Sequence, residues 1–305
     1  MLSRPDVLVL GGGGLLGEEW IQGVLAGIED ATGFDLRECE HFVGTSAGSI
    51  VAAKLAGGGT PRRPASAGTA LEPAVIPRSE PQLAGPVQLA RRAGEWTLAA
   101  WTPFAPFALA AAGAGGAFVR ASLLSRLPRP KRTLDSLREH VDGYGTRFDG
   151  RLRIVAVDRM AGRRVVFGSP GAPFATVASA VEASCTVPWL FAPVTIGGRE
   201  YVDGGVWSST NLDVAPAARD THVLCLNPTA GLHGAHTLVA VARRLARSAV
   251  SVEALALRRR GAIVRTIAPD LGSSVAMGAD FMDPEPRPRV LAAGYRQGLE
   301  LATAS

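Results

Sequence analysis

The chain is poor in cysteine, and the few cysteines that it has follow no pattern. Cys39, Cys185 and Cys225 are far apart and include no CxxC pair, which excludes a disulfide framework and favours a reducing compartment. The first residues lack the apolar stretch of a signal peptide, because Met1–Pro5 lead directly into the short apolar run Val7–Leu10. The sequence therefore predicts a cytoplasmic location and leaves peripheral membrane association open.

Lysine is almost absent as well. Lys54 and Lys131 are the only lysines, so arginine supplies nearly all of the positive charge, and the net charge is +5. A modest positive charge fits weak attraction to anionic lipid or nucleic acid, but no dense arginine run is interleaved with aromatic residues, so we expect no nucleic-acid partner. Apolar residues make up 47% and charged residues 19%, which is typical of a globular chain.

Short apolar runs and helix-compatible segments alternate at the start of the chain. Val7–Leu10 predicts a buried strand, residues 18–31 a helix, residues 41–43 a second strand and Ala47–Ala56 a second helix. This order is typical of an α/β fold with a parallel sheet. The pattern resumes from residue 151, with expected strands at 152–157, 164–167, 201–202, 222–226 and 262–267 and expected helices at 174–185, 237–259 and 286–303.

The alternation breaks between these two regions. Residues 57–86 are rich in glycine, proline, alanine and serine, which is typical of a mobile loop or linker. Residues 96–119 carry no charge, but prolines and glycines interrupt them, which disfavours a membrane span. Core or lid helices, or a surface that enters a lipid interface, fit this segment better. We expect 57–130 to form a cap on a single domain over 1–305.

A serine lies between two glycines at the expected turn from the second strand to the second helix. The motif is Gly44-Thr45-Ser46-Ala47-Gly48, which fits a nucleophile elbow of the GxSxG type. Its glycines leave room for a tight turn, and the helix N-terminus favours developing negative charge near Ser46. The alternative is a turn of small residues in which Ser46 only caps the helix.

The first strand runs into a glycine-rich loop. Gly12, Gly14 and Gly17 satisfy GxGxxG, so a dinucleotide site is one alternative. That site needs an acidic residue at the end of the second strand, whereas the acidic residues at 35–40 precede that strand. The other use of Gly12, Gly13, Gly14 and Gly17 is an oxyanion hole, because backbone without Cβ atoms can approach a reacting carbonyl and donate N–H groups to it.

A serine nucleophile needs a base, and Asp203 followed by Gly204 and Gly205 is one candidate. The same sequence also fits a plain turn. The histidines provide other candidates: His41, His140, His222, His233 and His236. Ser46, Asp203 and a later histidine would give the chain order of an α/β-hydrolase triad, although Ser46 lies early for that fold.

These three motifs, in this order, resemble the patatin-like phospholipase family, in particular bacterial patatin-like acyl hydrolases. The segments Ala183–Pro188 and Phe191–Val194 look like that family's approach to its DGG strand, and the resemblance covers roughly 7–56 and 151–210. In this family the glycine-rich loop forms the oxyanion hole, GxSxG bears the nucleophile, and the aspartate of DGG is the base of a Ser–Asp dyad.

The resemblance implies a three-layer α/β/α sandwich with a mostly parallel sheet. It implies Ser46 as nucleophile and Asp203 as base, with an oxyanion loop formed by Gly12, Gly13, Gly14 and Gly17. Gly44, Gly48, Gly204 and Gly205 support these groups by allowing close approach. It implies hydrolysis of a lipid acyl ester, a phospholipid or lysophospholipid, without a metal or organic cofactor. Segment 96–119 is then the expected place for an acyl chain or a membrane to dock.

The sequence departs from the family pattern in two places. Leu16 stands where many members carry arginine or lysine, so a cation that could assist the oxyanion is missing. After Asp203-Gly204-Gly205 the run Trp207–Asn211 replaces the usual asparagines and proline. The first departure leaves a rival hypothesis open, in which the protein binds lipid on the same fold with little or no catalysis.

Overall fold

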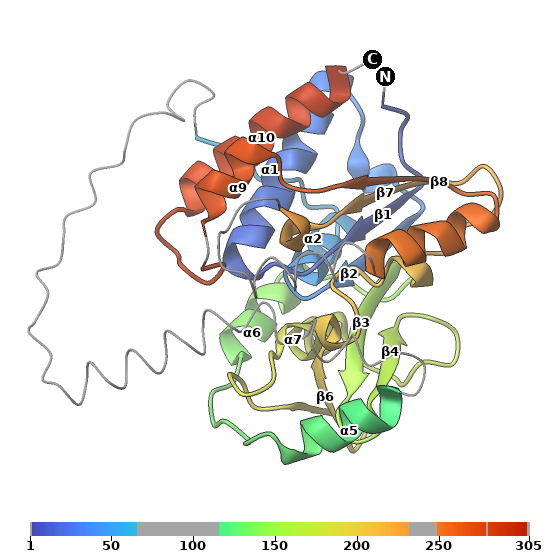
Figure 1. Cartoon of the computed structure of the whole chain (residues 1–305), viewed down its shortest axis with the longest axis vertical. Coiled ribbons are helices and arrows are strands. Elements are labelled where there is room, and N and C mark those ends of the chain that lie inside the picture. The colour runs from blue at the N-terminus through green and yellow to red at the C-terminus, as the bar shows by residue number, and fades with distance from the viewer. Residues whose placement is uncertain (1, 66–115, 232–248, 279, 304–305) are drawn as a thin grey trace, which may run out of the picture.

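The computed structural model describes residues 2–65, 116–231, 249–278 and 280–303. Within these residues, an eight-stranded sheet has the order β5-β6-β3-β2-β1-β7-β8, with β4 paired to β3 (Figure 1). The strands are β1 (Val7–Leu10), β2 (His41–Thr45), β3 (Leu152–Asp158), β4 (Arg163–Phe167), β5 (Val194–Ile196), β6 (Arg199–Asp203), β7 (His222–Leu226) and β8 (Ile263–Ile267). The helices are α1 (Gly14–Thr32), α2 (Ala47–Ala56), α5 (Gly116–Arg126), α6 (Asp135–Asp142), α7 (Val177–Cys185), α9 (Leu271–Met277) and α10 (Arg287–Thr303), with a further helix at 249–259.

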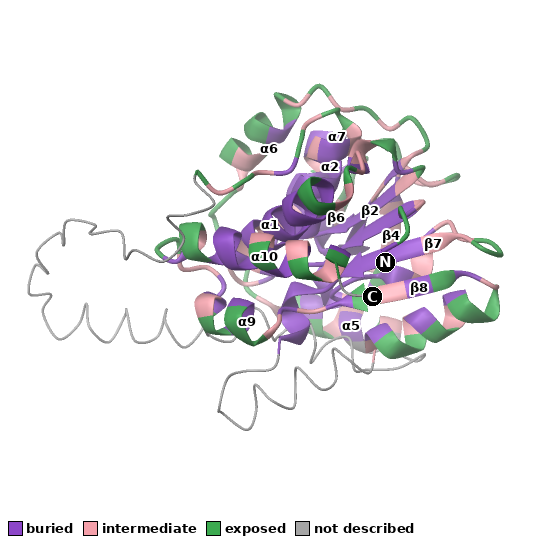
Figure 2. Ribbon diagram, turned by 90° about the horizontal axis from the view of Figure 1, so that it is seen from above, coloured by how far each residue is buried: buried purple, intermediate pink, exposed green. Residues whose placement is uncertain are grey.

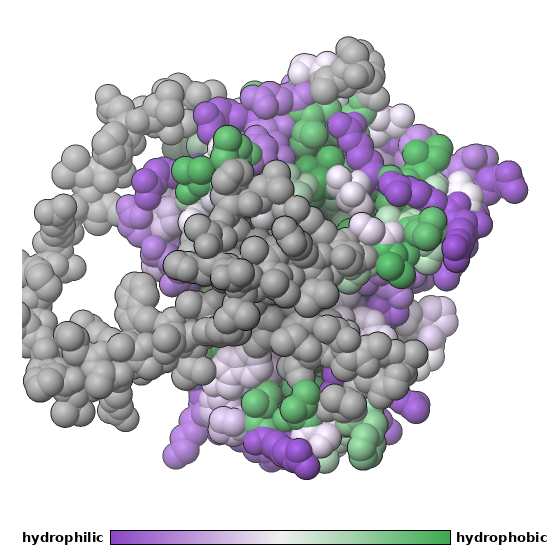
Figure 3. Space-filling view, viewed as in Figure 1, coloured by the Kyte–Doolittle hydropathy of each residue, from purple (hydrophilic) through white to green (hydrophobic). Residues whose placement is uncertain are grey.

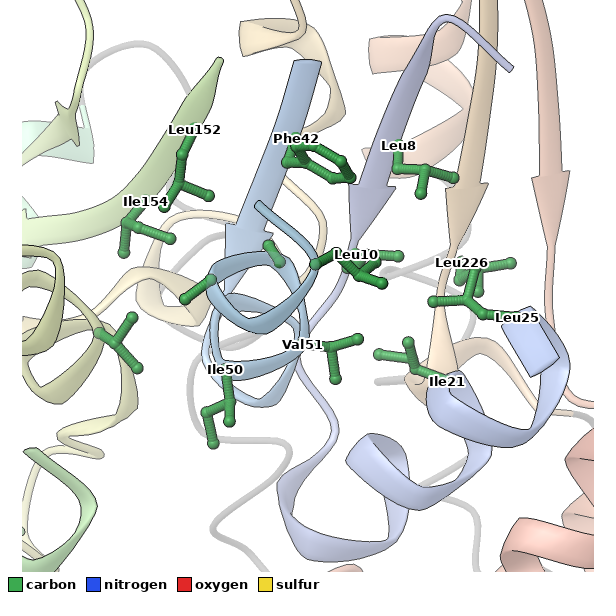
Figure 4. Packing of buried hydrophobic residues seen from close by; sticks show 14 of the residues in the cluster. Leu8, Leu10, Ile21, Leu25, Phe42, Ile50, Val51, Leu152, Ile154 and Leu226 are labelled. Atoms are coloured by element: carbon green, nitrogen blue, oxygen red, sulfur yellow. The ribbon is translucent and has the colours of Figure 1, made fainter. Parts of the chain in front are cut away.

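The sheet is buried on both faces. On β1, Leu8 and Leu10 join the core cluster under α1 and α2, whereas Val7 and Val9 join the cluster under the helix at 249–259. Figure 2 shows the buried strands between helices on either side, and Figure 4 shows apolar side chains of four strands meeting those of α1 and α2. Burying each large aliphatic side chain contributes about 1.5–3 kcal/mol. The expected α/β fold with a mostly parallel sheet and flanking helices is confirmed.

The sheet consists of a parallel part and an antiparallel part. Strands β3, β2, β1, β7 and β8 pair in parallel, as the βαβα pattern predicts. Strands β4 and β6 are antiparallel to β3, and β5 is antiparallel to β6. A two-residue turn at Gly197 and Gly198, with φ of 56° and 76°, joins β5 to β6. Two positive φ values are characteristic of a type I′ hairpin turn, which glycine adopts without strain.

Strands β2 and β6 occupy the same edge of β3, one after the other. Ile154 and Val155 pair with both β2 and β4, so these two strands lie on opposite edges of β3. Residues Ala156–Asp158 pair with both β4 and β6, which places β6 on the edge that β2 has left. Since β2 is parallel and β6 antiparallel to β3, their carboxyl ends meet head-on. Thr45 pairs with Val155, and Asp203 pairs with Ala156.

Most of the expected elements lie within a few residues of their predicted bounds. Helix α1 begins at Gly14 rather than residue 18, because the glycine run itself enters the helix, and α7 begins at Val177, where Thr176 caps it. The expected helix at 237–259 is helical over its described part, 249–259. Much of the expected cap lies outside the described residues, since 66–115 are among those not described. In the described part of the chain, no helix has the length and apolar character needed to cross a bilayer.

Candidate active site

Ser46 lies on a sharp turn between β2 and α2. Its backbone has φ 50° and ψ −126°, a conformation that is strained for a residue with a side chain. The glycines on either side make this turn possible by their missing Cβ atoms. A Cβ on Gly48 would collide with the carbonyl of Leu10, and one on Gly44 would collide with Cα of Ser49. The elbow therefore requires small residues at both positions of the GxSxG motif.

The strained turn is held from two sides. The N–H of Ser46 donates to Oγ of Ser184 at 2.9 Å, and Oγ of Ser184 donates to the carbonyl of Val155 at 2.6 Å. On the helix side, Oγ of Ser49 donates to the carbonyl of Ser46 at 2.6 Å. Ser184 is fully buried. Its contact with Ser46 joins residues distant in the chain, so the sequence carried no signal for this role beyond the family-like segment that contains it.

Asp203 ends β6 beside Ser46 and is 3% exposed. One carboxylate oxygen, Oδ1, accepts the N–H of Gly205 at 2.7 Å. Burial raises the pKa of the Asp203 carboxyl to about 7, although hydrogen bonds with the N–H of Gly205 and with the side chain of Ser46 lower it. A Cβ on Gly204 would collide with the carbonyl of Val155, which explains a glycine directly after Asp203. The structure thus joins a buried carboxyl, poised near neutrality, to the serine of the elbow.

The glycines of the glycine-rich loop differ in whether their N–H groups are already hydrogen-bonded within the protein. The N–H of Gly12 donates to the carbonyl of Ser209 at 2.8 Å, and the N–H of Gly17 donates to the carbonyl of Gly13 at 2.8 Å. These two N–H groups are therefore occupied. Gly12 instead gives room, because a Cβ there would lie 3.2 Å from Cβ of Ser46. Gly17 likewise gives room to Pro228, whose Cβ would lie 3.1 Å from an added Cβ.

Free donors remain at the beginnings of two helices. Among the described residues, the N–H groups of Gly13 and Gly14 at the start of α1, and of Ala47 at the start of α2, have no hydrogen-bond partner. Unpaired N–H groups at a helix N-terminus, together with the helix dipole, favour an anion. Ala47 was not singled out in the sequence, although the residue after the nucleophile commonly supplies such a donor.

A cavity of about 250 Å³ connects these groups. Of the residues predicted for the site, those that line it are Gly12, Gly13, Gly14, Ser46, Asp203 and Gly205. Gly17, Gly44, Gly48 and Gly204 lie behind it and make close backbone packing possible. The remaining wall is mainly apolar and includes Leu15, Ile50, Leu137, Val187, Phe191 and Phe281. Two further titratable groups line it: burial raises the pKa of both the Glu18 carboxyl and the Cys185 thiol.

No histidine lines the cavity in the described part of the chain. His41 and His222 are the first residues of β2 and β7. They lie at the amino ends of these parallel strands, whereas Ser46 follows the carboxyl end of β2. His140 lies on α6 and contacts the hydroxyl of Tyr144 at 2.9 Å. His233 and His236 lie outside the described residues. Among the described residues that line the cavity, the carboxyl groups are those of Asp203 and Glu18, and Asp203 is the one whose pKa is affected by the side chain of Ser46.

Leu16 belongs to the core rather than to the cavity. Its side chain is fully buried in the cluster between α1 and the sheet, and its N–H donates to the carbonyl of Phe281 at 3.1 Å. The neighbouring Leu15 is the residue whose side chain faces the cavity. The apolar residue at position 16 therefore fits the packing of this chain and leaves the N–H groups at the helix start accessible.

The fold and the site together define an α/β protein in which a serine on a strained turn lies beside the N-termini of two helices, α1 and α2. The chain belongs to the patatin-like phospholipase family, whose model matches residues 8–216, and this places it among lipid acyl hydrolases in the broad sense. No curated protein matches it.

Solved structures that are similar to this chain include VipD and ExoU. VipD from Legionella pneumophila is 16% identical with a TM-score of 0.44, and the match covers 98% of this chain and 67% of that one. The type III effector protein ExoU is 14% identical with a TM-score of 0.36, and the match covers 97% of this chain and 52% of that one.

Proposed function

We propose that this chain is a serine hydrolase of lipid acyl esters, phospholipid or lysophospholipid, in which Ser46 is the nucleophile and Asp203 is the base. The observation that carries the proposal is the head-on meeting of β2 and β6 on one edge of β3, which brings Ser46 and the buried carboxyl of Asp203 to one cavity. A base with a pKa near the working pH combines the deprotonated form with useful proton affinity. Asp203 fits that requirement because burial raises its pKa to about 7.

The reaction follows the order of a two-step acyl transfer. Asp203 takes the proton of Ser46 Oγ, which attacks the ester carbonyl, and the oxyanion accepts hydrogen bonds from the N–H groups of Gly13, Gly14 and Ala47. The C–O bond of the ester breaks, the protonated Asp203 returns its proton to the leaving alcohol, and an acyl-enzyme remains. Asp203 then takes a proton from water, the resulting hydroxide attacks the acyl carbonyl, and the carboxylic acid leaves as Asp203 returns the proton to Ser46 Oγ. Each oxyanion donor contributes about 3–4 kcal/mol to transition-state stabilisation.

The apolar wall of the cavity supports an acyl chain as the bound part of the substrate. Membrane contact through 96–119 stays a prediction, because most of that segment lies outside the described residues. Its described end belongs to α5, where Phe118 is 83% exposed. Figure 3 shows hydrophobic surface next to hydrophilic surface in the region of this helix, an arrangement compatible with a lipid interface.

Covalent labelling with a fluorophosphonate, read by mass spectrometry of the modified peptide, tests the nucleophile. We expect one adduct on Ser46 in the native protein and none in Ser46→Ala, with release of fatty acid from phospholipid vesicles lost in the same variant. Ser125→Ala, at an exposed position on α5 that does not line the cavity, is the matched control and should keep both signals. A folded native protein without an adduct would refute the enzyme and favour the rival lipid-binding protein.

A second experiment separates the dyad from a triad. The dyad predicts that His233→Ala and His236→Ala retain turnover within about twofold, whereas Asp203→Asn loses it. A triad with a C-terminal histidine predicts that one histidine variant is inactive and that the Asp203→Asn variant keeps measurable turnover. Measuring kcat on one ester substrate for all three variants distinguishes the two mechanisms.

A further inference from the structure

One loop contacts all three motifs of the proposed site. It comprises residues 207–211, the run that departs from the family pattern, and it follows the short helical turn Gly204–Val206. Its last residue, Asn211, is fully buried and has a left-handed backbone, with φ 49° and ψ 39°. Asparagine tolerates this conformation better than most residues. Asn211 does not line the cavity, so its role is not to contact substrate.

The amide of Asn211 bridges the gap between the ends of β2 and β6. Its Nδ2 donates to Oγ1 of Thr45 at 3.1 Å and contacts the carbonyl of Gly204 at 3.3 Å. Thr45 directly precedes Ser46, and Gly204 directly follows Asp203. The same Nδ2 donates to the carbonyl of Ser208 at 2.8 Å, which fixes the amide within its own loop. One side chain thus touches the backbone neighbours of both proposed catalytic groups.

The loop also holds the oxyanion side of the site. The carbonyl of Ser209 accepts the N–H of Gly12 at 2.8 Å, which orients the start of the glycine-rich loop. The carbonyl of Thr210 accepts a hydrogen bond from the Oγ1 hydroxyl of Thr45 at 3.4 Å. The position of this short loop therefore affects the nucleophile, the base and the oxyanion donors together.

Two charged side chains anchor the loop from outside the cavity. Glu253, on the helix at 249–259, accepts Oγ1 of Thr210 at 2.9 Å and the N–H of Leu212 at 2.9 Å, and burial raises the pKa of its carboxyl. Arg164, on β4, donates to Oδ1 of Asn211 at 3.2 Å and pairs with Asp213 at 2.6 Å. The hydrogen bond from Arg164 to Oδ1 of Asn211 fixes which end of the amide faces Thr45. Neither charged group takes part in the proposed reaction.

We infer that Asn211 is a positioning residue that sets the separation of Ser46 and Asp203 by tying the end of β2 to the end of β6. This inference rests on the proposed function. No ladder hydrogen bond joins the two strand ends, because they meet head-on rather than side by side. Losing the amide would let the two ends move independently, and misplacement by a fraction of an ångström lowers the rate of the chemical step more than it weakens substrate binding.

The test compares Asn211→Gly with Asn211→Asp, since both residues accept the left-handed backbone. The first removes the amide, and the second keeps its shape but turns an acceptor toward the carbonyls of Gly204 and Ser208. We expect kcat to fall about 10–100-fold in both, with KM within about twofold. In Asn211→Asp the added carboxylate faces Arg164 and lies near Asp213 and Glu253. We expect this carboxylate to raise the pH midpoint of the kcat/KM profile by about 0.5–1 pH unit.

Asp220→Gly is the matched control for a change at a left-handed residue. Asp220 is exposed, has φ 63° and lies in a loop away from the cavity, so kcat and the pH profile should stay at native values. Should the Asn211 variants fail to fold, Thr45→Val removes the Oγ1 acceptor with almost the same shape. We expect about a 5–20-fold fall in kcat for Thr45→Val and recovery in Thr45→Ser, which keeps the hydroxyl.

Fluorophosphonate labelling of the native protein keeps the two proposals apart. An unlabelled native Ser46 refutes the proposed function. A labelled native protein whose folded Asn211 variants keep native kcat and pH profile, per mole of folded protein measured by near-ultraviolet circular dichroism, overturns the positioning role and leaves the function intact. A fall in stability alone, with unchanged kinetics of the folded fraction, also overturns it.

Discussion

The two halves of the site are built in different ways. Ser46 lies in a βα unit in which the strand, the turn and the helix are adjacent in the sequence, so local features fix its geometry. Asp203 arrives much later in the chain, on an antiparallel strand whose position depends on pairing with β3. The position of the proposed nucleophile therefore depends on a local turn, and the position of the proposed base depends on the register between β6 and β3.

The two halves also differ in electrostatics. Ser46 lies where two helices begin, near the free N–H groups of Gly13, Gly14 and Ala47, a setting that favours negative charge. Asp203 is buried and receives the hydrogen bond of Gly205, and burial raises its pKa to about 7. One half favours a negative charge and the other disfavours it, and in the proposed mechanism this difference would promote transfer of a proton to Asp203 as the oxyanion forms.

The largest expected effect comes from removing either member of the dyad. Ser46→Ala and Asp203→Asn should each lower kcat by about 10⁴-fold. Since the two groups act as a unit, the double variant should be little worse than either single variant. Initial-rate assays on the three proteins measure this. Independent losses that multiply in the double variant would contradict a dyad and show that the two halves act separately.

Asp203→Asn should also stabilise the protein in a pH-dependent way. The pKa of this carboxyl is about 7 in the folded state, above the ordinary value of 3.8 for an aspartate, so the folded state binds the proton more tightly. Stability from this group is full below pH 4 and is lost as the pH rises to 7. We expect the variant to gain on the order of 3 kcal/mol in free energy of unfolding at pH 8 and almost nothing at pH 4.

Urea titrations at the two pH values measure this difference, with Asp220→Asn as an exposed control that should show none. An equal gain at both pH values would mean that the ionised carboxylate does not destabilise the fold. The base half of the site would then lack the electrostatic character that separates it from the nucleophile half.

The nucleophile half can be weakened alone through Ser184. Ser184→Ala removes the acceptor for the N–H of Ser46 and leaves the carbonyl of Val155 without its donor. We expect kcat to fall about 10–100-fold and the pH at which kcat/KM rises to stay near 7, because Asp203 keeps its surroundings. Rate measurements from pH 5 to pH 9 test both points. A shifted pH midpoint would show that Ser184 also affects the base.

The native pH profile tests the base half alone. With the pKa of Asp203 at about 7, kcat/KM should increase through pH 7 and level off above it, since the deprotonated carboxylate is the active form. Asn211→Gly should retain the same midpoint, as it adds no charge. A midpoint near pH 4 in the native protein would mean that Asp203 is solvated during turnover, for example by opening of the cavity.

The smallest effect on catalysis is expected at Leu16. Leu16→Arg places an unpaired charge in the core, so the free energy of unfolding should fall by more than about 3 kcal/mol, with no gain in kcat of the folded fraction. Leu123→Arg, at a position 44% exposed on α5, is the control and should change stability little. A faster Leu16→Arg enzyme would show that the side chain at this position reaches the oxyanion.

The parallel half of the fold was largely predictable from sequence, and the antiparallel half only in part. Val7–Leu10 and Ala47–Ala56 match their predictions because buried strands and small-residue turns leave local patterns. Strand β5 has only three residues and was missed, since so short a segment shows no alternation. The sequence indicated the glycine-rich loop but not which of its glycines have free N–H groups. That distinction depends on distant residues, since the N–H of Gly12 donates to the carbonyl of Ser209.

The roles of Ser184 and Asn211 could not be predicted for the same physical reason. Each acts through hydrogen bonds to residues far away in the chain, at 2.9 Å from Ser184 to Ser46 and 3.1 Å from Asn211 to Thr45. Such contacts exist only once β2, β6 and α7 have packed around β3. Asp203 was identified through its motif, whereas the reason that it meets Ser46 required the strand order.

The hairpin turn at Gly197 and Gly198 has an evolutionary consequence. A slip of one residue between β6 and β3 would displace Asp203 by about 3.3 Å and turn its side chain to the other face of the sheet. The two positive φ values select a two-residue turn, and this turn sets the residue at which β6 begins and its register against β5. Insertions and deletions, usually tolerated in surface turns, would be eliminated by selection at this one, although it lies outside the cavity.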